Sequence, residues 1–204
     1  MLLWLTDYLS EFIRAFSVFQ YLTLRSMISA MTALFLSLLI GPGFIDKLSR
    51  QQISQKVRAD GPKSHLSKEG TATMGGGLIL VVMVVATLCW GDLTNRYIWL
   101  ALLVTVSFGL IGLLDDYLKI SKNNSEGLTA RWKIFWQSLF GLLAAIYLYS
   151  TSESVVQTDL LIPFFKDIAI PLGVGSIFLS MILLVGMSNA VNLTDGLDGL
   201  AILP

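Results

Sequence analysis

The chain has 204 residues, of which 54% are hydrophobic, and its mean hydropathy is +0.72. Apolar runs this long and uniform exclude an ordinary soluble domain. The 14 Lys and Arg residues equal the 14 Asp and Glu residues in number, so there is no basic excess and no nucleic-acid partner is expected. The single cysteine, Cys89, excludes an intrachain disulfide.

The first 20 residues are aromatic-rich and amphipathic, with charges at Asp7, Glu11 and Arg14. They lack the basic start and small-residue cleavage site of a signal peptide. A helix lying in the membrane interface over residues 1–20 is therefore predicted.

Five apolar segments follow, and a membrane span needs about 20 such residues. Backbone polar groups in lipid must be paired within their own segment, so the segments must be helices. The predicted fold is an all-α, polytopic integral membrane protein, with residues 1–204 forming a single membrane domain. The five spans lie near residues 22–45, 72–90, 97–115, 132–150 and 171–191.

Basic residues are concentrated in two of the segments between spans. Ten of the 14 lie there, namely Lys47, Arg50, Lys56, Arg58, Lys63 and Lys68, then Lys119, Lys122, Arg131 and Lys133. The positive-inside rule makes these segments cytoplasmic and places the N-terminus outside. The expected cytoplasmic loops are 46–71, 116–131 and 192–204.

Two adjacent carboxylates, Asp115 and Asp116, end the third span. Hard oxygen ligands of this kind suit Mg²⁺, which proteins bind through one or two carboxylates plus substrate phosphates. Lys119 follows at i+4 and i+3, so it shares their helical face and can hold a phosphate or moderate the repulsion between them. A solvated helix end with an i,i+4 pair is the plainer alternative. A prenyl diphosphate synthase would have Asp where Lys119 stands.

A second polar string, residues 189–199, follows the fifth span on the same side of the membrane. Asn189 and Asn192 are three residues apart, as are Asp195 and Asp198, so each pair shares a face if the string is helical. Gly196 and Gly199 allow a ligand to approach the backbone closely. An ordinary turn is the competing interpretation.

A third polar stretch, residues 67–77, leads into the second span and contains Lys68 and Thr73. It ends in Gly75, Gly76 and Gly77, which serve equally well as small residues for helix packing. The predicted topology places all three strings on the cytoplasmic side.

Together these residues resemble the bacterial polyprenyl-phosphate sugar-phosphate transferases, and within them the branch that transfers phospho-N-acetylmuramoyl-pentapeptide. The resemblance spans the whole chain and rests on Asp60-Gly61-Pro62 and on residues 68–76, 112–119, 127–133, 163–166 and 189–201. Sister enzymes share the Asp pair but typically lack the Gly-Thr-x-Thr-Met-Gly-Gly entry to the second span. The family usually has Pro where this chain has Ala72.

The resemblance implies transfer of the phospho-sugar from UDP-N-acetylmuramoyl-pentapeptide to undecaprenyl phosphate, with release of UMP and a requirement for Mg²⁺. This is the first membrane step of peptidoglycan synthesis, in the bacterial inner membrane. Asp115 is expected to be the base and Asp116 to lie near the metal, with Asp115 also a candidate ligand. The expected substrate-binding residues are Lys68, Thr73, Lys119, Lys133, Asn189, Asn192, Asp195, Gly196, Leu197 and Asp198.

The family has about ten spans, so this chain is expected to be its N-terminal half and inactive alone. A homodimer is left open. Other functions remain as alternatives. One is a UDP-N-acetylglucosamine transferase with the same Asp pair; others are a non-catalytic scaffold and a half-transporter. A half-transporter predicts charges near span centres, whereas here the charges gather at one face.

Overall fold

The computed structural model describes residues 2–50, 74–121, 127–162, 165 and 168–194. Its helices are α1 (Leu2–Ser10), α2 (Leu22–Arg50), α3 (Gly75–Trp90), α4 (Arg96–Ser121), α5 (Ala130–Ser150) and α6 (Gly175–Thr194). Within the described residues, 3-10 helices cover Arg14–Gln20 and Val155–Thr158, and a two-stranded ribbon pairs β1 (Asp159–Leu161) with β2 (Ala169–Pro171). The chain divides into two compact units, Met1–Thr129 and Ala130–Pro204.

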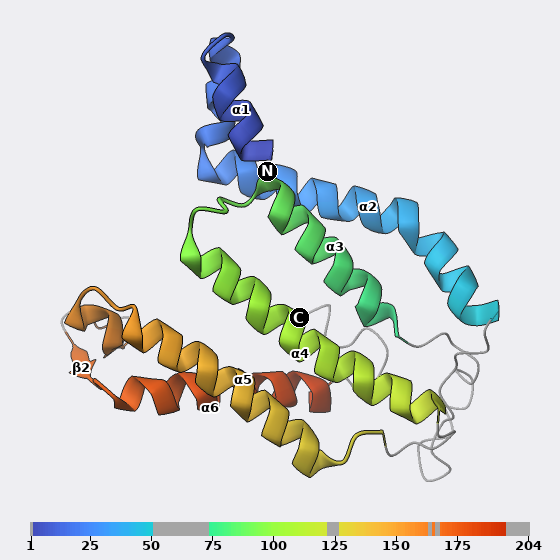
Figure 1. The fold of residues 1–204 in the computed structure, drawn as a ribbon, viewed down its shortest axis with the longest axis vertical. Coiled ribbons are helices and arrows are strands. Elements are labelled where there is room, and N and C mark those ends of the chain that lie inside the picture. Colours follow the sequence, from blue (N-terminus) through green and yellow to red (C-terminus); the bar gives the residue numbers. More distant parts are fainter. Residues whose placement is uncertain (1, 51–73, 122–126, 163–164, 166–167, 195–204) are drawn as a thin grey trace. The chain divides into compact units, whose positions relative to one another are not determined.

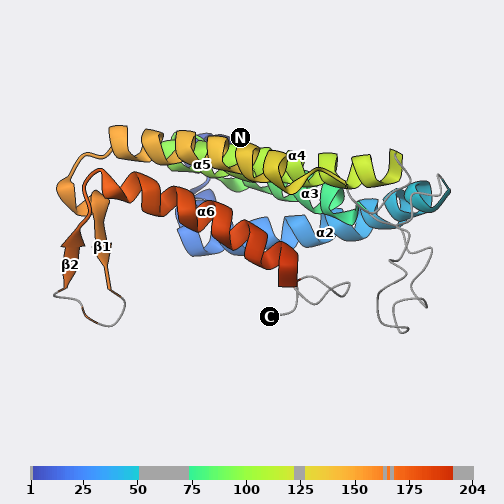
Figure 2. The same ribbon diagram turned by 90° about the horizontal axis from the view of Figure 1, so that it is seen from below.

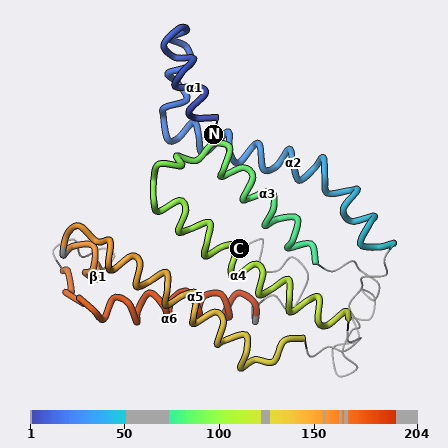
Figure 3. Tube along the Cα trace, viewed as in Figure 1, coloured from blue at the N-terminus to red at the C-terminus, as the bar shows by residue number. Residues whose placement is uncertain are grey.

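In the first unit, α2, α3 and α4 run up and down beside one another (Figures 1 and 3). Glycines allow the close approach that membrane helices favour. A Cβ on Gly41 would lie 3.7 Å from Leu78, and one on Gly109 would lie 2.7 Å from Leu80. These contacts place the end of α2, the start of α3 and the end of α4 at the same end of this unit.

Polar contacts fix the opposite end of the first unit. The Trp90 indole N–H donates to the Thr32 hydroxyl at 3.0 Å and so ties α3 to α2. In the loop before α4, the Thr94 hydroxyl and backbone N–H donate to Asp92 Oδ1 at 2.6 and 3.1 Å. These hydrogen bonds lower the pKa of Asp92, because they stabilise its ionised form.

In the second unit, α5 and α6 form an antiparallel hairpin. A Cβ on Gly141 would lie 3.7 Å from both Met181 and Val185, and Ala144 and Ala145 are buried nearby. The ribbon lies where α5 ends and α6 begins (Figure 2), with Asp159 opposite Pro171.

The surfaces of the helices are those of a membrane protein. Large apolar side chains such as Met31, Leu38 and Phe178 are exposed along them, as expected where lipid is the solvent. Among the described helices, α2, α4 and the Gly175–Asn192 part of α6 are long and apolar enough to cross a membrane. As described, α3 is apolar but has 16 residues. The less apolar α5 has 21 residues, with two basic residues in its first turn. The fold is all-α and polytopic, as predicted.

Several predicted boundaries differ from the observed ones. The predicted helix over residues 1–20 is, in the described part from residue 2, divided into α1 and a 3-10 helix. Strand β2 ends at Pro171, the first residue of the predicted fifth span, and α6 starts at Gly175, after Gly173, whose φ of +49° is incompatible with a helix. Helix α4 continues to Ser121, so Asp116 and Lys119 lie within a helix and not in the expected loop 116–131.

Candidate functional site

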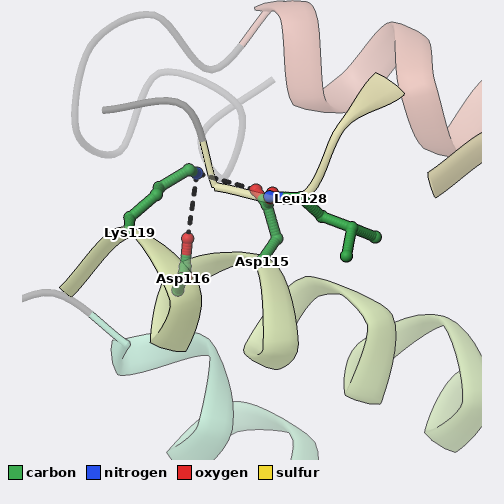
Figure 4. A network of polar contacts seen from close by, with 4 residues as sticks. All are labelled: Asp115, Asp116, Lys119 and Leu128. Atoms are coloured by element: carbon green, nitrogen blue, oxygen red, sulfur yellow. Dashed lines mark hydrogen bonds and ion pairs between the residues drawn. The ribbon is translucent and has the colours of Figure 1, made fainter. Parts of the chain in front are cut away.

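Of the two described carboxylates of the expected site, Asp115 is the more firmly held. It is 8% exposed, near the end of the apolar helix α4. Its Oδ1 accepts the backbone N–H of Leu128 at 2.7 Å. Its Oδ2 lies 2.7 Å from the ammonium of Lys119, one helical turn away (Figure 4). Both carboxylate oxygens are therefore engaged by groups of the chain itself.

The same ammonium also contacts Asp116. Lys119 Nζ lies 3.2 Å from Asp116 Oδ1, and the Asp116 side chain is 41% exposed. One cation thus bridges two adjacent anions, as expected from the i+3 and i+4 spacing, and it offsets their repulsion. The cluster Asp115–Asp116–Lys119 keeps a formal charge of −1, with Asp116 as its accessible carboxylate.

Gly127 and Leu128 lie against this cluster. Gly127 has φ +55°, which a side chain adopts only at a cost. A Cβ there would lie 2.5 Å from Asp115 Oδ1 and 2.8 Å from Lys119 Cε. Only glycine lets the backbone come close enough for Leu128 to donate to Asp115. Gly127 and Leu128 belong to the sequence pattern 127–133. That pattern did not predict that the Leu128 amide contacts Asp115 or that Gly127 allows this contact.

Asn189, Asn192 and Lys133 belong to the second unit. The Asn189 amide Nδ2 donates to Gln137 Oε1 at 2.7 Å and to the Val185 carbonyl at 2.8 Å. Asn192 is exposed, so the two asparagines of the string differ in environment although both lie on α6. Lys133 is half-buried in the first turn of α5.

Gln137 is a polar residue of this region that sequence reasoning missed. It is 2% exposed, and its Nε2 donates to the Ser188 hydroxyl at 3.4 Å. The sequence signal that could have identified Gln137 is a polar amide within an apolar helix. Burying such an amide costs free energy unless it is hydrogen-bonded.

Six expected site residues lie outside the described part of the chain: Lys68, Thr73, Asp195, Gly196, Leu197 and Asp198. Their proximity to the Asp115–Asp116–Lys119 cluster therefore stays a prediction.

A cavity of about 650 Å³ in the first unit lies away from the cluster. Arg25, Trp90, Asp92 and Ile98 are among its lining residues. Ile98 is 17 residues before Asp115 on the same helix, which corresponds to about 25 Å. This cavity is therefore not part of the Asp115 site.

The donor set of the cluster fits a hard divalent cation that also binds phosphates. Within the described ranges, no group of three or more His, Cys, Asp or Glu residues could hold a metal alone. Mg²⁺ commonly needs only one or two carboxylates when substrate phosphates complete its shell. Asp116, half-exposed and paired through one oxygen, fits this role better than Asp115, whose two oxygens are both engaged.

Comparison of the sequence with protein-family models identifies the class of enzyme to which the chain belongs. The model of glycosyl transferase family 4 matches residues 98–203, just over half of the chain. The match includes α5, α6 and nearly all of α4, together with the Asp115–Asp116–Lys119 cluster. The chain belongs to glycosyl transferase family 4, and it is a multi-pass membrane protein of the polyprenyl-phosphate sugar-phosphate transferase class.

Proposed function

We propose that this chain contributes to the transfer of phospho-N-acetylmuramoyl-pentapeptide from its UDP conjugate to undecaprenyl phosphate, with release of UMP. The observation that carries the proposal is the cluster of two carboxylates bridged by Lys119 at the end of an apolar helix. A site there can meet a lipid phosphate from the bilayer and a nucleotide from water. The Gly-Thr-x-Thr-Met-Gly-Gly entry at residues 70–76, with Ala72 as x, favours the muramoyl-pentapeptide branch.

The reaction is a phosphoryl transfer. An oxygen of the lipid phosphate forms a bond to the sugar-linked phosphorus of the diphosphate, and the bond from that phosphorus to UMP breaks. Two anionic substrates must approach each other, so positioning and charge neutralisation supply most of the catalysis. A cation beside the reacting phosphates would supply part of this neutralisation, and Lys119 Nζ lies 2.7 Å from Asp115 Oδ2.

We infer that Lys119 changes partners during the reaction. Its ammonium now occupies Asp115 Oδ2 and Asp116 Oδ1. An incoming phosphate offers it a more highly charged partner. Moving to the phosphate frees Asp115 Oδ2 to accept a proton from the lipid phosphate, while Leu128 continues to hold Oδ1. Lys119 thus keeps the carboxylates paired until substrate arrives.

Asp116, with Asp115 as a second candidate, would hold Mg²⁺. When bound, the metal would neutralise charge on the diphosphate and on the departing UMP. The remaining residues take their proposed roles from the family resemblance. Lys133 holds phosphate, and Lys68, Gly196, Leu197 and Asp198 border the uridine. The adjoining polar pocket is lined by Thr73, Asn189, Asn192 and Asp195.

The proposed site faces the cytoplasm of the bacterial inner membrane. The supporting observation is that ten of the 14 basic residues lie in the two segments that flank the second and third spans on one side. UDP-linked donors are made in the cytoplasm, so this orientation gives the nucleotide direct access.

Donor comparison tests the proposal. Membranes containing the protein as its gene encodes it would receive undecaprenyl phosphate, Mg²⁺ and either UDP-N-acetylmuramoyl-pentapeptide or UDP-N-acetylglucosamine, and UMP would be measured. We expect a preference of at least about a hundredfold in kcat/KM for the pentapeptide donor, the scale set by losing several binding contacts. A preference for UDP-N-acetylglucosamine would place the protein in the sister branch.

A further inference from the structure

We infer that Gln137 is a positioning residue. It holds the Asn189 amide so that the carbonyl oxygen of Asn189 accepts a hydrogen bond from the UDP-sugar. The inference rests on the proposed function, in which Asn189 lines the polar pocket. Gln137, on α5 of the α5–α6 hairpin, is 2% exposed and is the most deeply buried polar side chain of the described residues.

The orientation of the Asn189 amide follows from the partners around it. Val185 offers a backbone carbonyl at 2.8 Å, which can only accept, so the Asn189 atom facing it must be the nitrogen. The same nitrogen lies 2.7 Å from Gln137, which must therefore present its oxygen. The Gln137 nitrogen then points to the Ser188 hydroxyl at 3.4 Å.

Both N–H groups of the Asn189 amide are used in this arrangement. The group left to meet a ligand is its carbonyl oxygen, Oδ1, which accepts hydrogen bonds only. Asn189 itself is half-buried, in contrast to Gln137. The ligand group that it recognises is accordingly an N–H or O–H donor, such as the imide of uracil, a ribose hydroxyl or the acetamido N–H of the sugar.

The position of the pair in the hairpin supports this role. Lys133 lies one helical turn from Gln137 on α5, and Asn192 lies about one turn from Asn189 on α6. Because the helices are antiparallel, both turns lead toward the same end of the hairpin. The Gln137–Asn189 hydrogen bond thus fixes the register of the two helices just before the residues proposed to contact substrate.

Gln137→Met is the first test, because Met has nearly the same shape and removes both hydrogen bonds. We expect the KM for the UDP-sugar to rise about tenfold, the effect of one well-aligned hydrogen bond, with kcat changing less than about threefold. Asn189→Ala should give a similar or larger rise. In the Asn189→Ala background, Gln137→Met should change KM by less than about twofold. Equal effects of Gln137→Met in both backgrounds would overturn the inference.

Three further variants separate positioning from packing. Ser188→Ala loses only the long 3.4 Å contact, and Gly141→Ala adds a methyl group at ordinary contact distance in the same interface. Both should keep KM near the wild-type value. Gln137→Glu keeps an acceptor oxygen on a side chain of the same length. Its KM should therefore lie much closer to the wild-type value than the raised KM of Gln137→Met. Failure of this rescue, or a KM change that follows the loss of folded protein in thermal unfolding, would give Gln137 a purely structural role.

The assay uses whichever UDP-sugar the wild-type protein turns over. Preference for UDP-N-acetylglucosamine would reject the proposed donor and leave the Gln137–Asn189 test unchanged. Additive behaviour of the two residues with the preferred donor would reject the inference and leave the proposed function standing.

Discussion

The backbone N–H of Leu128 donates to Asp115 Oδ1 at 2.7 Å across 13 residues of sequence. The chain leaves α4 after Ser121 and returns to the face of the helix that carries its carboxylates. The amide and the Lys119 ammonium each contact one oxygen of Asp115 and together hold its side chain in place. In the proposed mechanism, departure of Lys119 would free Oδ2 for proton transfer while Leu128 still holds Oδ1.

Gly127→Ala should impair the site through this contact. The new Cβ would meet Asp115 Oδ1 at 2.5 Å, and the φ of +55° adds about 1 kcal/mol of backbone strain. We expect kcat/KM to fall at least about tenfold because Leu128 can no longer hold Asp115.

The matched control for Gly127→Ala is Gly173→Ala. Gly173 has a similar φ of +49°, but a Cβ there would have no atom within 4 Å. It should show comparable strain and activity within about twofold of wild type. Equal losses in the two variants would mean that Gly127 matters only for its backbone conformation.

Lys119→Met should affect binding of the lipid phosphate. Met keeps most of the apolar stem but removes the charge, which leaves two adjacent carboxylates to repel an incoming anion. We expect kcat/KM for undecaprenyl phosphate to fall about a hundredfold, with Lys119→Arg retaining a larger share of the activity. Lys47→Met, at an exposed position in the last turn of α2, is the control and should stay near wild type. Normal kinetics in Lys119→Met would exclude a role for this ammonium in transfer.

Cysteine labelling tests the orientation of the chain. In a Cys89→Ser background, Lys63→Cys should react with a membrane-impermeant maleimide only after the cells are opened, because position 63 lies in a basic segment. Glu153→Cys, in the exposed turn after α5, should react in intact cells. The reverse labelling pattern would show the opposite membrane orientation. The proposed site would then face away from the cytoplasm, where UDP-sugars are found.

The sequence was sufficient to predict the helices, because a run of apolar residues long enough to span lipid has no alternative to a helix. It also predicted the contacts of Lys119, since they depend only on helical spacing. Hydropathy placed the end of the third span at the first charge, Asp115, whereas helix α4 continues to Ser121. The last turns of α4 contain the contacts among Asp115, Asp116 and Lys119.

Contacts between distant segments were beyond the reach of sequence patterns. The burial of Gln137 against Asn189 depends on which helices pack together and in what register. The periodicity of a single helix predicts neither the packing partner nor the register. The start of α6 was missed for a related reason. The predicted span begins at Pro171, but Pro171 pairs with Asp159 of β1 and the helix begins at Gly175.

The central claim is that Asp115 and Asp116 form the catalytic centre of sugar-phosphate transfer. Its most direct test is Mg²⁺-dependent UMP release from UDP-N-acetylmuramoyl-pentapeptide and undecaprenyl phosphate by Asp115→Asn and Asp116→Asn variants, normalised to the protein present in the membrane. Each change keeps the side-chain volume and removes a negative charge, from the proposed base in Asp115→Asn and from the proposed metal ligand in Asp116→Asn. We predict that each variant loses about 10²–10⁴-fold in turnover, the range typical of removing acid–base assistance. Near-normal UMP release by both variants would contradict the claim and reduce the pair to a solvated helix end.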